Sequence, residues 1–166
     1  MIKRFKRNKK GFSLVELIIV IAIMVALVAV MAPAYVKYVA RAHDAVVESA
    51  AESVLQYVKA EMGDGSFTGV GKMEIKGVPN SNGKKYINVE WKENDEGVNT
   101  MQYMPGDSLA ADKGYAEFIS GCGVDQSKQI KSDLVYEIEI YSTQTVSGHP
   151  NLQAKMETVE NPENNP

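Results

Sequence analysis

The pattern of apolar and polar positions marks out a long apolar segment near the start of the chain. Between Phe12 and Tyr35 the only polar side chains are those of Ser13 and Glu16. A membrane core about 30 Å thick is crossed by about 20 helical residues, so residues 12–36 are long enough to span it. The pattern predicts an apolar helix with a single carboxylate close to its beginning.

Residues 37–62 continue as an amphipathic helix. Apolar residues at steps of three and four form one stripe, which is typical of a helix packed on one side. The stripe consists of Val47, Ala50, Ala51, Val54, Leu55, Val58 and Met62. Gly63, followed by Asp64-Gly65-Ser66, predicts the C-terminal cap. The combined helix has about 50 residues and a length of roughly 75 Å.

Pro33 falls inside this predicted helix. Proline has no amide hydrogen, so the carbonyl of Ala29 loses its partner, at a typical cost of about 3 kcal/mol in a helix interior. We expect a helix kink at Pro33.

After Gly65 the apolar positions alternate, which indicates strands. Val98 to Met104 is predicted to return antiparallel to 86–91 after a turn at 94–97, and residues 77–83 read as a loop. Residues 107–120 suggest a short helical or irregular excursion that breaks near Gly114. The predicted strands are 72–76, 86–91 (Ile87, Val89 and Trp91 on one face), 98–104, 134–141 (Leu134, Tyr136, Ile138 and Ile140 inward) and 152–159.

The fold class that follows is α+β. A long N-terminal helical spine, hydrophobic in its first half, would pack through Val47, Val54 and Val58 on a head of about four antiparallel strands. Residues 160–166 are polar, contain two prolines and are expected to form a loose tail.

Charge separates the first residues from the rest. Residues 1–11 carry +6 of an overall net charge of −3, which leaves −9 for the remainder. An acidic body argues against a general nucleic-acid binder, and a basic leader favours an N-terminus held in the cytoplasm. Cys122 is the only cysteine, so neither an intramolecular disulfide nor a zinc cluster of cysteines is possible.

The apolar segment has three ordinary interpretations. It could be a secretory signal cleaved near Ala32-Pro33-Ala34, a plain membrane anchor with Glu16 at the interface, or a buried core helix. The helical pattern continues past Ala34, which argues against cleavage there.

The junction between leader and helix resembles the class III signal sequence of type IV prepilins. The resemblance covers roughly the first fifty residues and depends on the leader charge, the apolar length, Pro33 and the run Gly11-Phe12-Ser13-Leu14-Val15-Glu16. It implies that a membrane prepilin peptidase cuts between Gly11 and Phe12 and methylates the new amine of Phe12. An inner-membrane assembly platform, its ATPases and minor pilins would then build a helical homopolymer from subunits stored in the lipid bilayer.

The resemblance also implies an organisation for the chain and a role for Glu16. Its parts would be a removed leader (1–11), a membrane and filament-core half-helix (12–36), an amphipathic half-helix (37–63), a head (64–159) and the tail (160–166). Glu16 would pair with the Phe12 amine of a neighbouring subunit and set its register, because an unpaired carboxylate is costly in lipid. Two departures stand out: residues 14–33 contain no glycine to loosen the helix, and the single cysteine matches the disulfide-free pilins more usual in Gram-positive bacteria.

No residues suggest catalysis, a cofactor or a metal. His43 is on the helix, His149 is in an expected loop, and neither has a nucleophile and acid around it. Asn94, Asp95, Glu96 and Asp107 offer oxygens at ordinary turn spacing, which usually means solvated side chains rather than a calcium site.

The sequence therefore predicts a non-enzymatic main subunit of a type IV pilus, membrane-bound before assembly and on the cell surface afterwards. One alternative is the major pseudopilin of a type II secretion system or a competence pilus. Another, from a different class, is a monomeric membrane-anchored or secreted binding domain. The sequence does not distinguish adhesion, motility, aggregation and DNA uptake.

Overall fold

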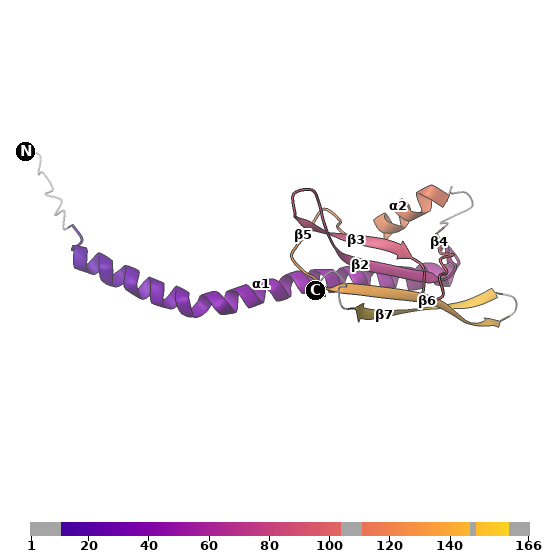
Figure 1. Ribbon diagram of the computed structural model, residues 1–166, viewed down its shortest axis with the longest axis horizontal. Coiled ribbons are helices and arrows are strands. Elements are labelled where there is room, and N and C mark those ends of the chain that lie inside the picture. The colour runs from indigo at the N-terminus through magenta and orange to yellow at the C-terminus, as the bar shows by residue number, and fades with distance from the viewer. Residues whose placement is uncertain (1–10, 104–110, 147–148, 160–166) are drawn as a thin grey trace, which may run out of the picture. The chain divides into compact units, whose positions relative to one another are not determined.

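A computed structural model describes residues 11–103, 111–146 and 149–159 (Figure 1). Its elements in chain order are α1 (Leu14–Asp64), β1 (Phe67–Thr68), β2 (Gly71–Pro79), β3 (Lys85–Lys92), β4 (Gln102–Tyr103), α2 (Ala111–Gly121), β5 (Gln129–Ile130), β6 (Val135–Val146) and β7 (His149–Val159). The chain forms two compact units, one up to Val39 and one from Ala40 onward, and α1 contributes to both.

In the first unit α1 is the only regular element of the described residues, and its side chains are exposed as far as Tyr38. The helix begins at Leu14 and not at Phe12 as predicted, because residues 11–13 are not helical. By length and composition α1 is also the one helix of the described residues that can cross a membrane, with a mean hydropathy of 3.1 in its apolar window.

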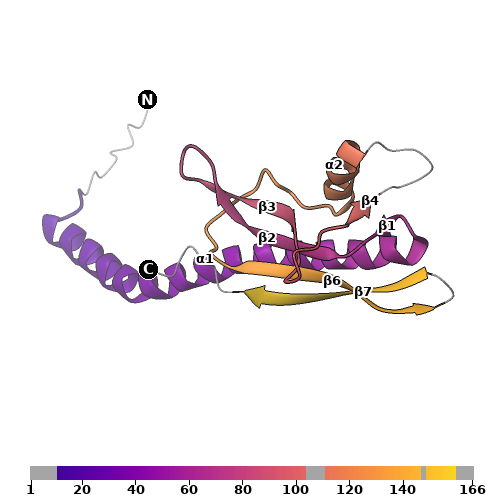
Figure 2. The same cartoon turned by 45° about the vertical axis from the view of Figure 1, so that its right-hand side comes forward.

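In the second unit the remainder of α1 lies along one face of a sheet (Figure 2). The predicted stripe is confirmed. Val47, Ala50, Ala51, Val54 and Val58 are buried, while Leu55 and Met62 pack against the core with part of their surface exposed. Near the start of this part of α1, the hydroxyl of Ser132 donates a 2.6 Å hydrogen bond to the carboxylate of Asp44.

The main sheet has five strands in the order β5-β3-β2-β6-β7, and every pair is antiparallel. This agrees with the predicted antiparallel head. Side chains that face the core lie opposite one another on neighbouring strands. Met73 lies opposite Trp91 and Ile138, and Ile75 lies opposite Val89 and Tyr136. β1 and β4 form a separate two-stranded sheet.

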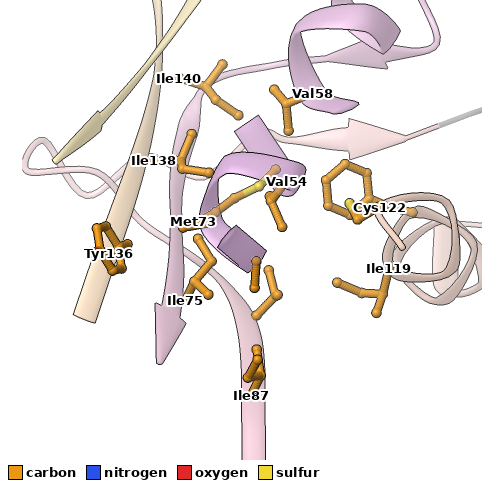
Figure 3. Close-up of a cluster of buried hydrophobic side chains, with 14 of the residues drawn as sticks. Val54, Val58, Met73, Ile75, Ile87, Ile119, Cys122, Tyr136, Ile138 and Ile140 are labelled. Carbon is orange, nitrogen blue, oxygen red and sulfur yellow. The ribbon is translucent and has the colours of Figure 1, made fainter. Parts of the chain in front are cut away.

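The core is one cluster built from the helix, the sheet and α2. Figure 3 shows Val54 of α1 between Met73 and Ile75 of β2 on one side and Ile119 of α2 and Cys122, the residue after α2, on the other. Six aromatic rings contribute to it or border it, with Phe118 contacting Tyr57, Phe67, Trp91 and Tyr103 at centroid distances of 5.5–5.7 Å.

Several predicted boundaries are wrong. The helix runs through Gly63, and Gly65 takes the left-handed backbone conformation (φ 86°) that ends it. Residues 77–79 were predicted as loop but pair with Ile87, Tyr86 and Lys85, so the turn begins only at Asn80. Gly77 leaves room for the side chain of Ile130, whose Cδ1 would have to shift if residue 77 carried a side chain.

The predicted pairing of 98–104 with 86–91 is also wrong. Only Gln102–Tyr103 is a strand within the described part of that segment, and its partner is β1. α2 runs through Gly114 without a break. A larger residue would clash at this position, because the helix backbone passes close to the carbonyl of Tyr103. β5 lies in a stretch that the alternation did not mark, and β6 continues to Val146, beyond the predicted end at Tyr141.

Candidate assembly site at the N-terminus

The segment before α1 is short, non-helical and exposed. Gly11, Phe12 and Ser13 lie outside the helix, and the side chain of Phe12 is 93% exposed. Proteases cut preferentially at exposed backbone outside regular structure. The Gly11–Phe12 bond, where cleavage is predicted, is exposed and lies outside the helix.

Ser13 and Glu16 close the first turn of the helix. The backbone N–H of Ser13 donates a 2.9 Å hydrogen bond to Oε2 of Glu16, and the N–H of Leu17 donates to the carbonyl of Ser13. This is half of a capping box, in which the side chain at the third helical position satisfies the N–H of the cap residue. Glu16 also places a negative charge in the first turn, where the helix dipole favours it.

This cap was not predicted, although the sequence contains its signal, Ser-x-x-Glu before an apolar run. A carboxylate has two oxygens and about four lone-pair directions, so accepting one bond from Ser13 leaves capacity for a cation. No ion pair of Glu16 occurs within the described residues.

Apolar side chains surround this site and follow it along the first unit. Leu14 is 72% exposed and Val30 79%. Every residue from Leu17 through Ala32 is both apolar and exposed. Pro33 lies inside α1, as predicted, and the helix continues on both sides of it. The kink at Pro33 stays a prediction.

The other candidate residues do not form a second site. Asn94 Oδ1 accepts backbone N–H bonds from Glu96 and Val98, which makes it a turn-forming side chain. Asp95 pairs with Lys72 at 2.7 Å, and Asp107 lies outside the described residues. Within the described ranges, no group of three or more His, Cys, Asp and Glu side chains is placed to hold a metal ion.

The two histidines and the cysteine are also placed. His43 is half-buried on α1, and His149 begins β7 opposite Val146 instead of lying in the expected loop. Cys122 is buried in the core, and this burial raises the pKa of its thiol to about 12. A thiol that stays protonated is a weak nucleophile.

Comparison with known proteins gives one match. Residues 6–32 match the model of a sequence family described as the prokaryotic N-terminal methylation motif. No curated protein and no solved structure matches the chain. The matched residues include Gly11, Phe12, Glu16 and most of the apolar segment, and together with the long apolar helix they are consistent with membrane anchoring.

Proposed function

Because the chain is a prepilin of the type IV pilin-like kind, we propose that it is the main structural subunit of a type IV pilus. Cleavage between Gly11 and Phe12 and methylation of the Phe12 amine convert it to the mature subunit. The observation that carries the proposal is a capping carboxylate, Glu16, one turn after the proposed cleavage point and at the start of the exposed apolar half of α1.

The exposed apolar half of α1 favours two successive environments that shield it from water. Apolar side chains from Leu14 to Val36 gain about 25 cal/mol for each Å² removed from water. Lipid removes that surface before assembly, with the N-terminus on the cytoplasmic side, and the helices of other subunits remove it in the surface filament. The subunit is a structural protein that polymerises with copies of itself.

Glu16 links processing to polymerisation. Cleavage frees a primary amine at Phe12, and methylation converts it to a cationic secondary amine. The free capacity of the Glu16 carboxylate can accept a hydrogen bond from such an amine of an adjoining subunit. Breaking one side of a buried ion pair costs about 3–5 kcal/mol, so a subunit lacking either group would be rejected at the growing end. The prepilin peptidase, the inner-membrane platform with its ATPases, and minor pilins are the partners that this pathway requires.

Mass spectrometry of fibres sheared from cells that produce this protein tests the proposal. We expect the chain to be the main component and its first residue to be N-methylated Phe12. A chain that begins at Tyr35 would identify an ordinary secreted protein, and one that retains Met1 would identify a membrane anchor. Either result would overturn the proposed function.

A further inference from the structure

Four charged residues form a single line on the exposed side of α1 in the second unit. Arg41, Glu48, Glu52 and Lys59 are spaced by seven, four and seven residues, and all four are exposed. At 100° for each helical residue they lie within about 40° of one another around the helix. Read along α1, the line is therefore positive, negative, negative, positive.

The charges of this line are not neutralised inside the chain. None of the four makes an ion pair with another described residue. Glu48 and Glu52 are like charges four residues apart, an arrangement that destabilises an isolated helix. Asp44, the acid nearest to Arg41 along the chain, already accepts a hydrogen bond from the buried hydroxyl of Ser132.

We propose that this line is a contact between parallel copies of the chain, offset by either seven or eleven residues. The inference rests on the proposed function, because subunits stored in one membrane with the same orientation can meet only in parallel. An offset of seven residues, about 10.5 Å, places Arg41 of one copy beside Glu48 of the other and Glu52 beside Lys59. An offset of eleven, about 16.5 Å, places Arg41 beside Glu52 and Glu48 beside Lys59.

The same pattern disfavours the other arrangements. Two parallel copies in register would oppose four pairs of like charges, and an offset of four would bring Glu48 against Glu52. An antiparallel pair centred on the line would again oppose like charges. Because the line has no net charge, a uniformly acidic or basic surface gains nothing from it, and charge complementarity selects a staggered second copy.

Charge exchange separates the two offsets. Arg41→Glu should reduce sheared filaments at least tenfold while the membrane pool of processed subunit stays at the wild-type level. Arg41→Glu with Glu48→Arg restores both pairs at an offset of seven and creates two repulsive pairs at eleven. Arg41→Glu with Glu52→Arg does the reverse. Lys128→Glu, an equal charge change on an exposed residue outside α1, is the control and should assemble normally.

We expect one double exchange, and only one, to restore filaments. The proposal is overturned if Arg41→Glu assembles as the wild type does, or if neither exchange rescues it. These results leave the proposed function intact when the wild-type chain still forms fibres. Absence of the wild-type chain from surface fibres would instead contradict the proposed function itself.

If the charge-exchange variants fail to accumulate, disulfide cross-linking measures the offset between copies instead. Ser49→Cys with Gln56→Cys reports an offset of seven, and Ala45→Cys with Gln56→Cys reports eleven, while all four charges remain. Within one chain these positions are too far apart to bridge, and the native Cys122 is buried. One pair should give a ladder of oligomers on a non-reducing gel after oxidation of intact cells, and a ladder from neither overturns the proposal.

Discussion

At the scale of single residues, Glu16 has two separable properties. Its oxygen Oε2 accepts the backbone N–H of Ser13 and so caps α1, and its charge is available for the amine of another subunit. Glutamine retains the first property and loses the second, because Glu and Gln both serve at this position of a capping box. Glu16→Gln and Glu16→Ala therefore separate the effect of the charge from the effect of the cap.

Glu16→Gln should be cleaved and should accumulate in the membrane, yet form few or no filaments, because the cap remains and the charge is gone. Glu16→Ala should be equally deficient in filaments and also lose the cap hydrogen bond, a loss typically of about 1 kcal/mol of helix stability. Electron microscopy of the cell surface and immunoblots of the membrane fraction measure both. Abundant filaments from Glu16→Gln would show that capping, and not charge, is the function of this residue.

Two glycines with opposite environments give a second residue-scale prediction. Gly69 has a φ of 90° and approaches the backbone of Thr100, so Gly69→Ala combines left-handed strain with a collision. Gly63 lies inside α1 with open space around it, and Gly63→Ala should stabilise by up to about 1 kcal/mol. Urea unfolding of the detergent-solubilised chain should show the first variant losing at least about 2 kcal/mol. Equal urea midpoints for the Gly69→Ala and Gly63→Ala variants would contradict the backbone geometry at Gly69.

At the scale of elements, α1 and β2 organise the second unit. β2 is central, paired with β3 on one side and β6 on the other, and its inward residues Met73 and Ile75 meet the buried stripe of α1. Lys72, Glu74 and Lys76 alternate with them on the other face. The carboxylate of Glu74 is buried between Lys76, at 2.8 Å, and Lys92. The hydroxyl of Tyr115 on α2 also donates to the carbonyl of Val89 on β3, which satisfies part of a strand edge that β5 leaves uncovered.

Ile138 tests the packing of β6 against α1. Its side chain is fully buried, so Ile138→Ala should lower the free energy of unfolding by about 2–5 kcal/mol through lost burial and a new cavity. Asn151→Ala, at an exposed position of the adjoining strand β7, should change it by less than about 0.5 kcal/mol. Chemical denaturation followed by the fluorescence of Trp91 measures both, and similar effects would contradict the assigned core.

At the scale of the whole molecule, buried protonated groups should make the head sensitive to alkali. Burial raises the pKa of Cys122 from 9.0 to about 12. Burial, and then its 2.5 Å hydrogen bond with Tyr57, raises the pKa of Tyr103 above its usual value of 10.0. Each group holds its proton to a higher pH when folded than when unfolded, so the unfolded state loses protons first as pH rises.

The stability that these groups contribute should be complete below about pH 9 and decline between about pH 9 and 12. Thermal unfolding of the detergent-solubilised chain at pH 7, 9 and 10.5 measures the decline. Tyr103→Phe removes one ionising group, so it should be less stable at pH 7 but show a shallower decline. An identical slope in this variant would exclude Tyr103 as a cause.

The sequence predicted the features that depend on neighbouring residues. Helix periodicity identified the buried stripe of α1, because residues three and four apart share a face whatever they pack against. Alternation identified β2, β3, β6 and β7, and the inward residues of β3 and β6, because residues two apart in a strand share a face. The run from Gly11 to Glu16 indicated the methylation motif that residues 6–32 match, and processing and assembly at this run stay proposals.

Only the tertiary structure decided the features that depend on distant segments. Gly77 lies within β2 and Gly114 within α2, although the local pattern predicted a loop at one and a break at the other. Ile130 approaches the first glycine and the carbonyl of Tyr103 the second, and neither approach can be read from local pattern. Gln102–Tyr103 pairs with β1 and not with β3, since the partner of a short strand is chosen by the packing of the whole head. Local periodicity specifies which face of an element is apolar, whereas the contacts between elements decide where each one ends and what it meets.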